Sequence, residues 1–344
     1  MSAPDLRARV ESVLKARTDG PVSVAAVTPL TGGACQENFR VEVELAGEPT
    51  VFALRSDART ALPGSIRRAA EHAVIEAAVS VGVPTPRARW LTADLVRPGA
   101  HAYFLDWLDG EAIGARVTCH PRVAEARAAL PEQLGAALAA VHRVTPGTHP
   151  ALPVDREPFH TDADPARAAL RFARGMLDRL PRPRPACELA LRWLDAHRPK
   201  RGPTTLVHAD FRTGNFMVTS QGLAGVLDWE FAHWGDPMED IGWLCVRDWR
   251  FGCVDRPAGG LCDRRTFARA YEAAGGAAVD PDRVHWWEVC GNLRWGAAAA
   301  FQGLRFAEGE DDFELLAIPR RAAEMEYEAL RLIELGPPSR RGQG

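Results

Sequence analysis

A short polar loop between two apolar runs carries the residue types that phosphoryl transfer needs. The stretch LVHADFRTGNFMV, residues 206–218, places Asp210 five residues before Asn215, with the cation Arg212 between them. A carboxylate can orient a substrate hydroxyl and take its proton, an amide oxygen can hold Mg²⁺, and a cation can offset the charge of the moving phosphate. Chemistry is usually placed on loops that a buried scaffold supports, so this loop is the first candidate site.

A second acid follows on the next apolar segment. The stretch LAGVLDW contains Asp228 near its end, and the turn residues Ser-Gln-Gly separate it from NFMVT. Two short strands with turn residues between them predict a hairpin, which would bring Asn215 and Asp228 close together. An amide oxygen and a carboxylate, completed by water and phosphate oxygens, form an ordinary ligand set for Mg²⁺. Asn215 and Asp228 are therefore the predicted metal ligands.

Residues around this loop leave other interpretations open. His208 and Asp210 could together bind zinc in a hydrolase, although no second His or Cys pair stands at ligand spacing. We expect instead that His208 holds the loop by hydrogen bonds and is not a base. Asp240 lies in the apolar stretch EDIGWLC and is expected to bond the backbone of the same loop. Arg212 could also be a solvated surface arginine.

The elements that position the loop begin with a sheet-rich region. Alternating apolar residues bounded by turn residues indicate strands in the first part of the chain, and a helical period indicates two helices. The expected helices are 4–18 and 65–81, and the expected strands are 22–30, 38–47, 49–56, 87–96 and 101–108. The chain up to Asp109 is therefore predicted to be mixed α and β structure.

Beyond Asp109 and Gly110 the pattern becomes mainly helical. In residues 131–144 the apolar side chains share one helical face, and Pro131 suits the first turn of that helix. Further helices are expected at 165–180, 184–197, 263–275, 281–305 and 313–335, with short strands at TTLVH, NFMVT and LAGVLDW, and with a disordered tail at 336–344. The predicted fold class is α+β, with a small sheet-rich N-terminal lobe at 1–109 and a larger, mainly helical C-terminal lobe at 110–344.

Composition limits the classes of partner. The chain has 344 residues, 46% of them apolar, and a net charge of −3, so it offers no basic field for nucleic acid. It contains no apolar run of about 18 residues and no signal-peptide pattern, so we expect no membrane span. The seven cysteines form no C-x-x-C pair, which predicts reduced thiols and a cytoplasmic protein. Only Lys15 and Lys200 are lysines, so cationic roles fall to arginine.

Three motifs together resemble a known family. The pattern H-x-D-x-x-x-x-N, the strand that ends in D-W-E and the later G-D-P-x-x-D are similar to the aminoglycoside phosphotransferase and choline kinase family, whose two-lobed fold resembles that of protein kinases. The resemblance spans about residues 24–305 and is strongest in 206–245. It implies an ATP- and Mg²⁺-dependent phosphotransferase that moves the γ-phosphate to a hydroxyl of a small molecule. The implied catalytic residues are Asp210 and Arg212, and the implied metal ligands are Asn215 and Asp228.

The same resemblance assigns nucleotide contacts in the N-terminal lobe. Gly32 and Gly33 stand where the family has its nucleotide-covering loop, although alone they would be a plain turn. Arg55 on the third strand would clamp the α- and β-phosphates, and Glu71 in the next helix would orient it. Either charge could instead be solvated on the surface. Because position 55 has arginine where lysine is usual in the family, the choice between ATP and GTP as the phosphate donor stays open. The hinge FLDWLDGE would receive adenine through the backbones of Leu105, Asp106 and Trp107.

The acceptor is predicted from a narrower resemblance. HADFRTGN, LDWEFAHWGDPMEDIGWLC and WRFG are similar to kinase proteins found beside, or fused to, acyl-CoA dehydrogenases, and some of that branch phosphorylate hydroxyacyl-CoA thioesters. Arg247 and Arg250 beside Trp249 suit an anionic, partly planar group. Residues 263–341 contain 14 acids and 11 arginines, so they offer no dominant field to draw a polycation. A hydroxyacyl-CoA or a similar anionic metabolite is therefore the predicted acceptor.

Other acceptors and another class of protein stay open at this stage. The acidic run 308–312 could receive an aminoglycoside, or it could be a solvated loop. Choline and homoserine are further candidate acceptors, and the two arginines near Trp249 could be structural. The rival of another class is a catalytically silent pseudokinase that only holds a nucleotide. The presence of Asp210, Asn215 and Asp228 speaks against it.

Overall fold

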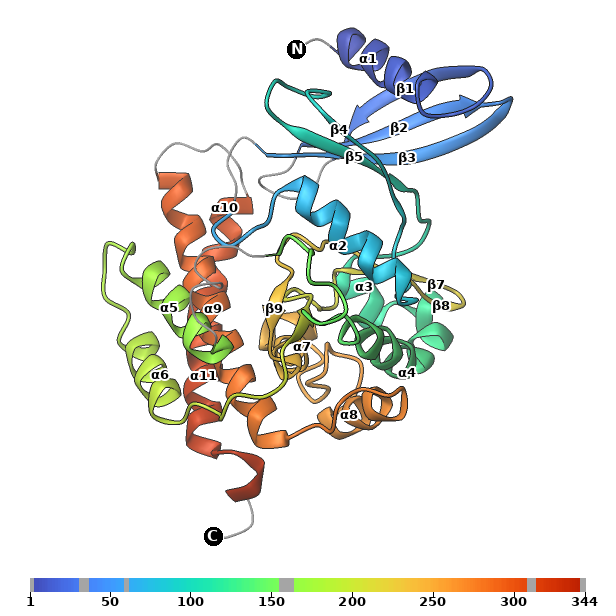
Figure 1. Cartoon of the computed structure of the whole chain (residues 1–344). Coiled ribbons are helices and arrows are strands. Elements are labelled where there is room, and N and C mark those ends of the chain that lie inside the picture. The colour runs from blue at the N-terminus through green and yellow to red at the C-terminus, as the bar shows by residue number, and fades with distance from the viewer. Residues whose placement is uncertain (1–2, 31–36, 59–61, 155–163, 308–313, 341–344) are drawn as a thin grey trace.

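The computed structural model describes residues 3–30, 37–58, 62–154, 164–307 and 314–340. Two features singled out in the sequence, the pair Gly32 and Gly33 and the acidic run 308–312, lie outside these residues. Within them the chain forms a sheet-rich N-terminal part and a larger, mainly helical C-terminal part (Figure 1). The predicted α+β fold class is confirmed. Among the described residues, no helix combines the length and the apolar character that crossing a membrane would require.

The N-terminal part is built on an antiparallel sheet that has five strands within the described residues. In sheet order these strands are β1 (Val22–Pro29), β2 (Glu37–Leu45), β3 (Glu48–Ser56), β5 (His101–Asp106) and β4 (Ala88–Ala93). Helix α1 (Ala3–Lys15) lies over one face of the sheet, and α2 (Arg68–Ser80) lies between the other face and the helical part (Figure 1). The strands and both helices lie close to their predicted positions.

Strand β5 shows how side-chain alternation builds two apolar clusters. Ala102 and Phe104 are buried in the cluster that α1 completes, whereas Tyr103 and Leu105 are buried in the larger cluster that includes α2. Neighbouring residues of a strand point to opposite faces of the sheet. One strand therefore contributes to both layers, and the sheet is covered on both sides.

The chain leaves the sheet after Asp106 and enters the helical part through Gly110. The φ angle of Gly110 is +152°, and a Cβ atom there would lie 2.8 Å from the carbonyl oxygen of Val218. Any side chain would clash, which explains why glycine stands at this position. Glu111 then pairs with Val218 through two backbone hydrogen bonds of 2.8 and 3.0 Å. The lobe boundary predicted at Asp109 and Gly110 falls in this crossing segment and stays a prediction.

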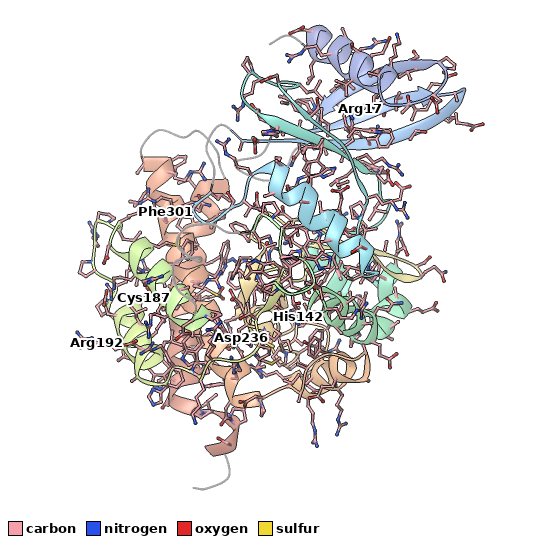
Figure 2. All side chains as sticks on the ribbon, in the orientation of Figure 1. Arg17, His142, Cys187, Arg192, Asp236 and Phe301 are labelled. Atoms are coloured by element: carbon pink, nitrogen blue, oxygen red, sulfur yellow. The ribbon has the colours of Figure 1, made fainter. Side chains whose placement is uncertain are left out.

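The C-terminal part packs its helices around α9 (Pro281–Ala307), which has 27 residues. Helices α5, α6, α7 and α11 contact α9 directly. The remaining bounds are α3 (Gly114–Cys119), α4 (Ala124–Val141), α5 (Pro165–Leu177), α6 (Pro185–Ala196), α7 (Pro237–Leu244), α8 (Arg264–Ala273), α10 (Glu314–Ala317) and α11 (Ala322–Leu335). Figure 2 shows His142 and Asp236 inside this part and Arg192 at its outer edge.

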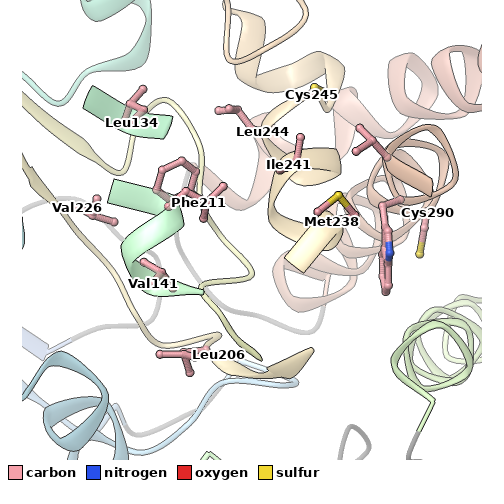
Figure 3. Packing of buried hydrophobic residues seen from close by; sticks show 14 of the residues in the cluster. Leu134, Val141, Leu206, Phe211, Val226, Met238, Ile241, Leu244, Cys245 and Cys290 are labelled. Carbon is pink, nitrogen blue, oxygen red and sulfur yellow. The ribbon is translucent and has the colours of Figure 1, made fainter. Parts of the chain in front are cut away.

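A continuous apolar cluster joins these helices to the candidate loop. Phe211 of the loop is fully buried and belongs to the same cluster as Leu134 of α4 and Leu244 of α7 (Figure 3). Leu206, on the strand before the loop, and Val226, which pairs with Phe216 on the strand after it, are also members (Figure 3). Burying one large apolar side chain contributes about 1.5–3 kcal/mol. The apolar runs that frame the polar loop in the sequence therefore anchor it at both ends.

Two short antiparallel ladders carry the ends of the loop. They are β6 (Thr205–Val207) with β9 (His233–Gly235), and β7 (Phe216–Thr219) with β8 (Gly222–Val226). The hairpin predicted between NFMVT and LAGVLDW is confirmed. Just past β8, Leu227 donates its backbone N–H to the carbonyl of Asn215 at 2.8 Å. Asp228 consequently follows directly beside the end of the loop.

Two expectations about helix boundaries are wrong. Pro131 does not begin a helix: it lies inside α4, which starts at Ala124 because the stretch AEARAAL is rich in strong helix formers. The single helix expected at 313–335 is divided, since Pro319 lacks the backbone N–H that a continuous helix would use.

The expectation that the tail is disordered is wrong for its first residues. Residues 338–340 form a short 3₁₀ turn. Ser339 donates its backbone N–H to a carboxylate oxygen of Asp282 at 3.0 Å, and its hydroxyl bonds the same side chain. The start of α9 therefore holds this part of the tail.

Candidate functional site

Asp240 on α7 holds the start of the candidate loop. Helix α7 has a capped first turn, because the Asp236 carboxylate accepts the N–H of Met238 at 3.0 Å. One turn further on, the two carboxylate oxygens of Asp240 accept the backbone N–H groups of His208 at 2.8 Å and Ala209 at 2.7 Å. Asp240 is fully buried. The structural role predicted for this residue is confirmed.

The ring of His208 ties the loop to the neighbouring hairpin. Its Nδ1 accepts the backbone N–H of Asp210 at 3.2 Å, so Nε2 carries the proton and donates to the carbonyl of Leu227 at 3.1 Å. Burial lowers the pKa of His208 and outweighs the opposing effect of Asp240 and the other nearby carboxylates. Both ring nitrogens are thus in use on a neutral ring, which confirms a structural role.

The zinc alternative finds no support in the described part of the chain. Within those residues, no group of three His, Cys, Asp or Glu side chains is arranged as a metal ion would need. A structural or catalytic zinc site uses three or four such ligands. His208 also has no nitrogen left to offer a metal, because one accepts and the other donates a hydrogen bond.

Two residues of the site have left-handed backbone conformations. The φ angles are +61° at Ala209 and +65° at Asp228. Such conformations cost a non-glycine residue about 1–3 kcal/mol and persist only where the surrounding structure holds them. At Ala209 the holding contact is the hydrogen bond to Asp240, and before Asp228 it is the bond between Leu227 and Asn215. Strain of this kind is typical of functional sites.

The carboxylate of Asp210 receives three side-chain donors. Trp243 Nε1 donates to Oδ1 at 2.9 Å, and Arg212 Nε donates to the same oxygen at 3.0 Å. Asn215 Nδ2 donates to Oδ2 at 2.5 Å. Asp210 is only 6% exposed, and a carboxylate in so buried a place is tolerated when donors compensate its charge. The structure therefore brings three of the predicted site residues together.

Trp243 is a site residue that sequence reasoning missed. It lies 33 positions after Asp210, on a different element. Its ring is 5.6 Å from that of Trp249, and the guanidinium of Arg212 lies over Trp249 at 4.4 Å from the ring centroid. The side chain of Arg212 is 24% exposed. Arg212 is thus held between Asp210 and an aromatic surface, which does not fit a solvated surface arginine.

Arg55 connects the sheet to Asp228. Its Nη2 donates to Asp228 Oδ1 at 2.8 Å and lies 3.3 Å from Glu71 Oε1. Arg55 is 9% exposed and Glu71 is fully buried, so neither is a surface charge and the predicted ion pair is present. Burial would raise the pKa of Asp228, but Arg55 above all outweighs burial and lowers that pKa. Asp228 is therefore ionised, as a metal ligand must be.

A second arginine, which the sequence analysis did not single out, supports this pair. Arg68 on α2 forms an ion pair with Glu71, lies 3.5 Å from Glu230 Oε2 and donates its Nε to the carbonyl of Ser56 at 3.2 Å. Glu71 therefore has a cation on each side, which fixes the carboxylate that orients Arg55. The available sequence signal was the three-residue spacing of Arg68 and Glu71 on one helix.

Asn215 and Asp228 fit a small, hard cation. Asn215 turns its amide nitrogen towards Asp210, which leaves the amide oxygen for another partner. The ionised side chain of Asp228 is 26% exposed, so it can be reached. Amide and carboxylate oxygens are the donors that Mg²⁺ accepts, with water and phosphate oxygens completing its shell. The chemistry of this donor set matches the metal that the sequence predicts.

The residues predicted to meet adenine lie at the end of β5. Leu105 is inside the strand and pairs with both β3 and β4. Asp106 forms an ion pair with Arg89, in which Nη2 and Oδ2 are 2.9 Å apart. Trp107 is the first residue beyond the strand. The backbone contacts to adenine stay predictions, and Trp107 is the one of the three whose backbone lies outside the sheet.

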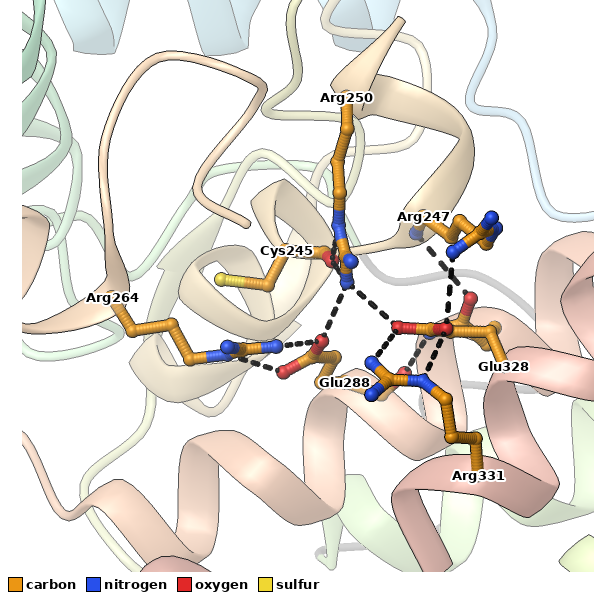
Figure 4. Close-up of polar contacts among 8 residues, drawn as sticks. Cys245, Arg247, Arg250, Arg264, Glu288, Glu328 and Arg331 are labelled. Atoms are coloured by element: carbon orange, nitrogen blue, oxygen red, sulfur yellow. Dashed lines mark hydrogen bonds and ion pairs between the residues drawn. The ribbon is translucent and has the colours of Figure 1, made fainter. Parts of the chain in front are cut away.

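The prediction that Arg250 contacts an acceptor is wrong. Arg250 is 2% exposed, and its Nη2 donates to the carbonyl of Cys245 at 2.8 Å, to Glu288 at 3.0 Å and to Glu328 at 3.1 Å (Figure 4). Arg250 bridges two carboxylates buried between α9 and α11, and each of them also pairs with a further arginine, Glu288 with Arg264 and Glu328 with Arg331. Arg247 lies 3.4 Å from Glu328 at the edge of the same cluster. The structural alternative is confirmed for Arg250.

Comparison with known sequences agrees with this geometry. Residues 26–287 match the model of a family described as the phosphotransferase enzyme family. A stretch of 64 residues is 42% identical to acyl-CoA dehydrogenase family member 10 of Mus musculus. That stretch makes up 18% of this chain and 6% of the mouse protein, so the chain spans only a small part of this relative.

Several solved structures share the fold. A protein of Ralstonia eutropha JMP134, described as an aminoglycoside phosphotransferase, aligns with a TM-score of 0.73 at 21% identity, over 95% of this chain and 98% of that one. The choline kinase LicA of Streptococcus pneumoniae aligns with a TM-score of 0.60 at 14% identity, over 94% and 98%. At these identities the likeness shows the fold alone, a two-lobed kinase-like one.

Proposed function

The chain belongs to the phosphotransferase enzyme family, and we propose that it moves the γ-phosphate of ATP, with Mg²⁺ as cofactor, to the hydroxyl of a hydroxyacyl-CoA. The coarser activity, phosphoryl transfer to a hydroxyl of a small molecule, is that of the family. One observation carries the proposal: a buried carboxylate, Asp210, accepts hydrogen bonds from Asn215 and Arg212, beside the ionised Asp228.

Asp210 is the proposed base. The acceptor hydroxyl donates a hydrogen bond to its carboxylate, and the proton moves there as the hydroxyl oxygen attacks phosphorus. Trp243 and Arg212 both bond Oδ1, so Oδ2, which accepts a hydrogen bond from Asn215, is the oxygen that faces the hydroxyl. Most of the rate enhancement then comes from positioning and from compensating charge, because phosphoryl transfer asks little covalent chemistry of a protein.

Asn215 and Asp228 are the proposed metal ligands. When bound, Mg²⁺ neutralises charge on the β- and γ-phosphates. Asp228 has to exchange its contact with Arg55 for this role, and Arg55 is then able to face the α- and β-phosphates while Glu71 still orients it. Gly32 and Gly33 would cover the same phosphates, which stays a prediction.

Arg212 is proposed to offset charge on the transferred phosphoryl group. Its guanidinium already lies within hydrogen-bonding distance of the proposed base and rests on the ring of Trp249. An arginine presents several donors in a fixed plane, which suits phosphate oxygens. The aromatic surface restricts where this plane can move.

Two observations support a hydroxyacyl-CoA as acceptor. The matched mouse relative is an acyl-CoA dehydrogenase family member. Arg212, which is 24% exposed and lies over the buried ring of Trp249, places a cation beside Asp210, and this cation attracts an anionic acyl-CoA more strongly than a polycation. Because Arg250 is buried elsewhere, it takes no part in this argument.

The test is a competition between acceptors. MgATP is supplied with 4-hydroxyacyl-CoA, kanamycin, choline and homoserine at equal concentrations, and the phosphorylated products are resolved by mass, with the Asp210→Asn variant as the blank. We expect phosphorylated hydroxyacyl-CoA to predominate. Aminoglycoside phosphate as the main product would refute the proposed acceptor. A wild-type protein that binds MgATP yet phosphorylates none of these compounds would favour the pseudokinase.

A further inference from the structure

Two thiols from distant parts of the chain meet on the surface of the helical part. Cys119 is the last residue of α3, and Cys253 follows the short 3₁₀ turn Arg247–Arg250. Their Sγ atoms are 3.7 Å apart, although 134 positions separate them in the sequence. Cys119 is exposed and Cys253 is half-buried. Both thiols are therefore open to small oxidants in solution.

The two thiols have different chemical environments. Hydrogen bonds from the Thr118 hydroxyl and from the thiol of Cys253 lower the pKa of Cys119, and Arg127 and Arg256 act in the same direction. Burial, followed by the neighbouring Cys119, raises the pKa of Cys253. A reactive thiolate beside a less acidic thiol is the arrangement found in redox-sensitive pairs.

We propose that Cys119 and Cys253 form a reversible disulfide, which makes this pair a modification site of the protein. The S–S bond is about 2.05 Å long, so the sulfurs have to approach each other by roughly 1.7 Å. Two features leave the backbone room for this movement. Cys119 is the last residue of its helix, and Cys253 follows Gly252, which has a φ of +90° and no atom within 4 Å of the place a Cβ would take.

Hydrogen peroxide is the oxidant for which the chemistry balances. The Cys119 thiolate attacks one peroxide oxygen, the O–O bond breaks, and the departing hydroxide takes up the proton that the thiol lost, giving a sulfenic acid and one water. The Cys253 sulfur then attacks the sulfenic sulfur and the S–O bond breaks, which releases a second water. Overall, two thiols and one peroxide yield one disulfide and two water molecules.

The bond would join two segments that already pack against each other, and the second of them supports the candidate loop. A Cβ at Gly114, the first residue of α3, would lie 2.1 Å from the ring of Phe251, so the two segments are already tightly packed. Beyond Cys253, the carbonyl of Gly259 accepts the hydroxyl of Thr213 at 2.7 Å. A cross-link between Cys119 and Cys253 therefore restrains the backbone that holds Thr213. We expect the oxidised protein to melt at a higher temperature than the reduced one.

The test is thiol chemistry on the folded protein in a Cys35→Ser background, because Cys35 lies outside the described residues. After treatment with hydrogen peroxide in slight excess, we expect the intact mass to fall by two hydrogens and the titratable thiols to fall by two. Proteolysis should release one peptide pair that joins positions 119 and 253, and dithiothreitol should reverse all three changes.

Three variants make this test decisive. Cys119→Ser should keep the remaining thiols titratable, and Cys253→Ser should stop at a sulfenic acid that dimedone traps. Cys262→Ser is the matched control: burial raises the pKa of Cys262 to about 12, so its loss should leave disulfide formation unchanged. Oxidation of Cys119 in the parent protein to sulfinic acid without a cross-linked peptide would overturn the proposal. So would the finding that both thiols are still free after peroxide treatment and before any reductant is added.

A different observation concerns the proposed base and rests on the proposed function. We infer that Trp243 is a positioning residue for Asp210. Trp243 is 7% exposed, the guanidinium of Arg294 lies 5.2 Å from its ring centroid, and Trp249 packs near its ring. Arg294 also forms an ion pair with Glu239, which lies one turn before Trp243 on α7. The indole is thus confined, and so is the N–H that it donates to Asp210.

The other two donors to Asp210 have further roles in the proposed reaction. The amide oxygen of Asn215 is assigned to the metal, and Arg212 turns to the transferred phosphoryl group. Trp243 has no such second partner, so its hydrogen bond to Oδ1 persists while the substrates are bound. The bond fixes the carboxylate plane and directs Oδ2 to the acceptor hydroxyl.

Trp243→Phe tests this role, with Trp295→Phe as the matched control. Trp295 packs 5.0 Å from Trp249 and donates to Asp248, so its replacement removes an indole N–H from the same aromatic group without touching Asp210. In Trp243→Phe we expect kcat to fall roughly 10- to 100-fold, as for one hydrogen bond to a charged group. The KM for ATP should hold, because Trp243 does not contact the nucleotide in the proposed reaction.

A readout without turnover separates this inference from the proposed function. In protein labelled with ¹⁵N-tryptophan, the indole resonance of Trp243 is the one missing from Trp243→Phe. We expect Asp210→Asn to shift the Trp243 resonance by more than it shifts any other indole resonance. Equal kinetics in Trp243→Phe and Trp295→Phe would overturn the inference, as would an unmoved resonance. A wild type without transfer activity but with the shifted resonance would contradict the proposed function alone.

Discussion

The two oxygens of the Asp210 carboxylate have unequal partners. Oδ1 is bonded by Trp243 and Arg212, and Oδ2 is bonded by Asn215. A base needs one oxygen that can also accept the acceptor hydroxyl, and Oδ2 meets this need better than Oδ1, which already has two side-chain donors. The asymmetry distinguishes a carboxylate that takes a proton from one that only holds a loop, such as Asp240, whose oxygens accept backbone N–H groups.

The first prediction follows from this assignment. Asp210→Asn should lower kcat by a factor on the order of 10²–10⁴, since an amide cannot accept the proton. Binding of MgATP, measured by calorimetry, should change little, because Asp210 is not placed on the nucleotide. Asp248→Asn is the control, since Asp248 accepts a tryptophan N–H nearby without contacting the loop. A raised KM for ATP with an unchanged kcat would instead make Asp210 a nucleotide contact.

At the residue scale the sequence predicts what is close along the chain. Asp210, Asn215 and Asp228 could be found because a loop and a hairpin fix their separation. Trp243 could not, because its contact depends on how α7 packs against the loop. For Arg68 the spacing to Glu71 was a signal, but its contact with Glu230 depends on how α2 packs. Arg250 was misjudged for the same reason: neighbouring positions suggested an exposed cationic patch, but Glu288 and Glu328 of distant helices draw its side chain inward.

At the scale of elements, α7 unites the parts of the site. From one short helix, Asp236 caps the first turn, Asp240 holds the loop and Trp243 bonds Asp210. The sequence signal for the helix was weak, since it spans only eight residues and all of them are buried. A fully buried helix lacks the apolar and polar alternation that marks a surface helix. No helix is therefore predicted here from the sequence, and α7 was found only in the structure.

The second prediction concerns how α7 is anchored. Burial would raise the pKa of Glu239, but His233 and Arg294 outweigh it and lower the pKa to about 2 from an ordinary 4.5. A lowered folded-state pKa means that the unfolded chain takes up the proton first as pH falls. The stability that Glu239 contributes is therefore complete above pH 4.5 and is lost between 4.5 and about 2. This loss should amount to about a few kcal/mol.

Urea unfolding of the wild type and of Glu239→Gln at a series of pH values checks this expectation. The two curves of unfolding free energy against pH should converge below pH 4.5, with the variant less stable at neutral pH. Glu324→Gln changes an exposed carboxylate of α11 and should follow the wild type throughout. Parallel curves for wild type and Glu239→Gln would mean that this carboxylate has no lowered pKa.

The third prediction concerns the buried charges between α9 and α11. Arg250→Met leaves Glu288 and Glu328 without the cation that lies between them (Figure 4). Removing one partner of a buried ion pair typically costs about 3–5 kcal/mol. Because Arg264 still pairs with Glu288 and Arg331 with Glu328, we expect a loss at or below the lower end of that range in the free energy of unfolding, whereas the KM for the acceptor should stay unchanged. Arg321→Met, at an exposed position, should cost little by comparison. A stable variant with a raised acceptor KM would restore Arg250 to the acceptor site.

At the scale of the whole molecule, the sheet and the helical part meet through charged contacts. Arg55 of β3 reaches Asp228 beyond β8, Arg68 of α2 reaches Glu230, and the N–H of Ile66 donates to the carbonyl of Glu230 at 2.7 Å. The sequence predicts that two parts exist and where the chain passes between them, because Gly110 and the change of periodicity mark the place. It does not predict these contacts, which depend on the orientation of the two parts.

The last prediction uses this junction as a sensor for the nucleotide. A ligand that binds only the folded protein stabilises it by mass action, by about 2.7 kcal/mol at one hundred times Kd. MgADP should therefore raise Tm in the wild type, and the part of the rise that requires Mg²⁺ should vanish in Asp228→Ala. Each protein is compared with its own nucleotide-free Tm, because Asp228→Ala also removes the partner of Arg55 and keeps a strained backbone at φ +65°. ADP with EDTA is the control.

If Asp228→Ala keeps the full Mg²⁺-dependent rise in Tm, Asp228 is not a metal ligand. Its contact with Arg55 would then be a structural link between the sheet and the helices, and the metal would have to be sought near Asn215 without it.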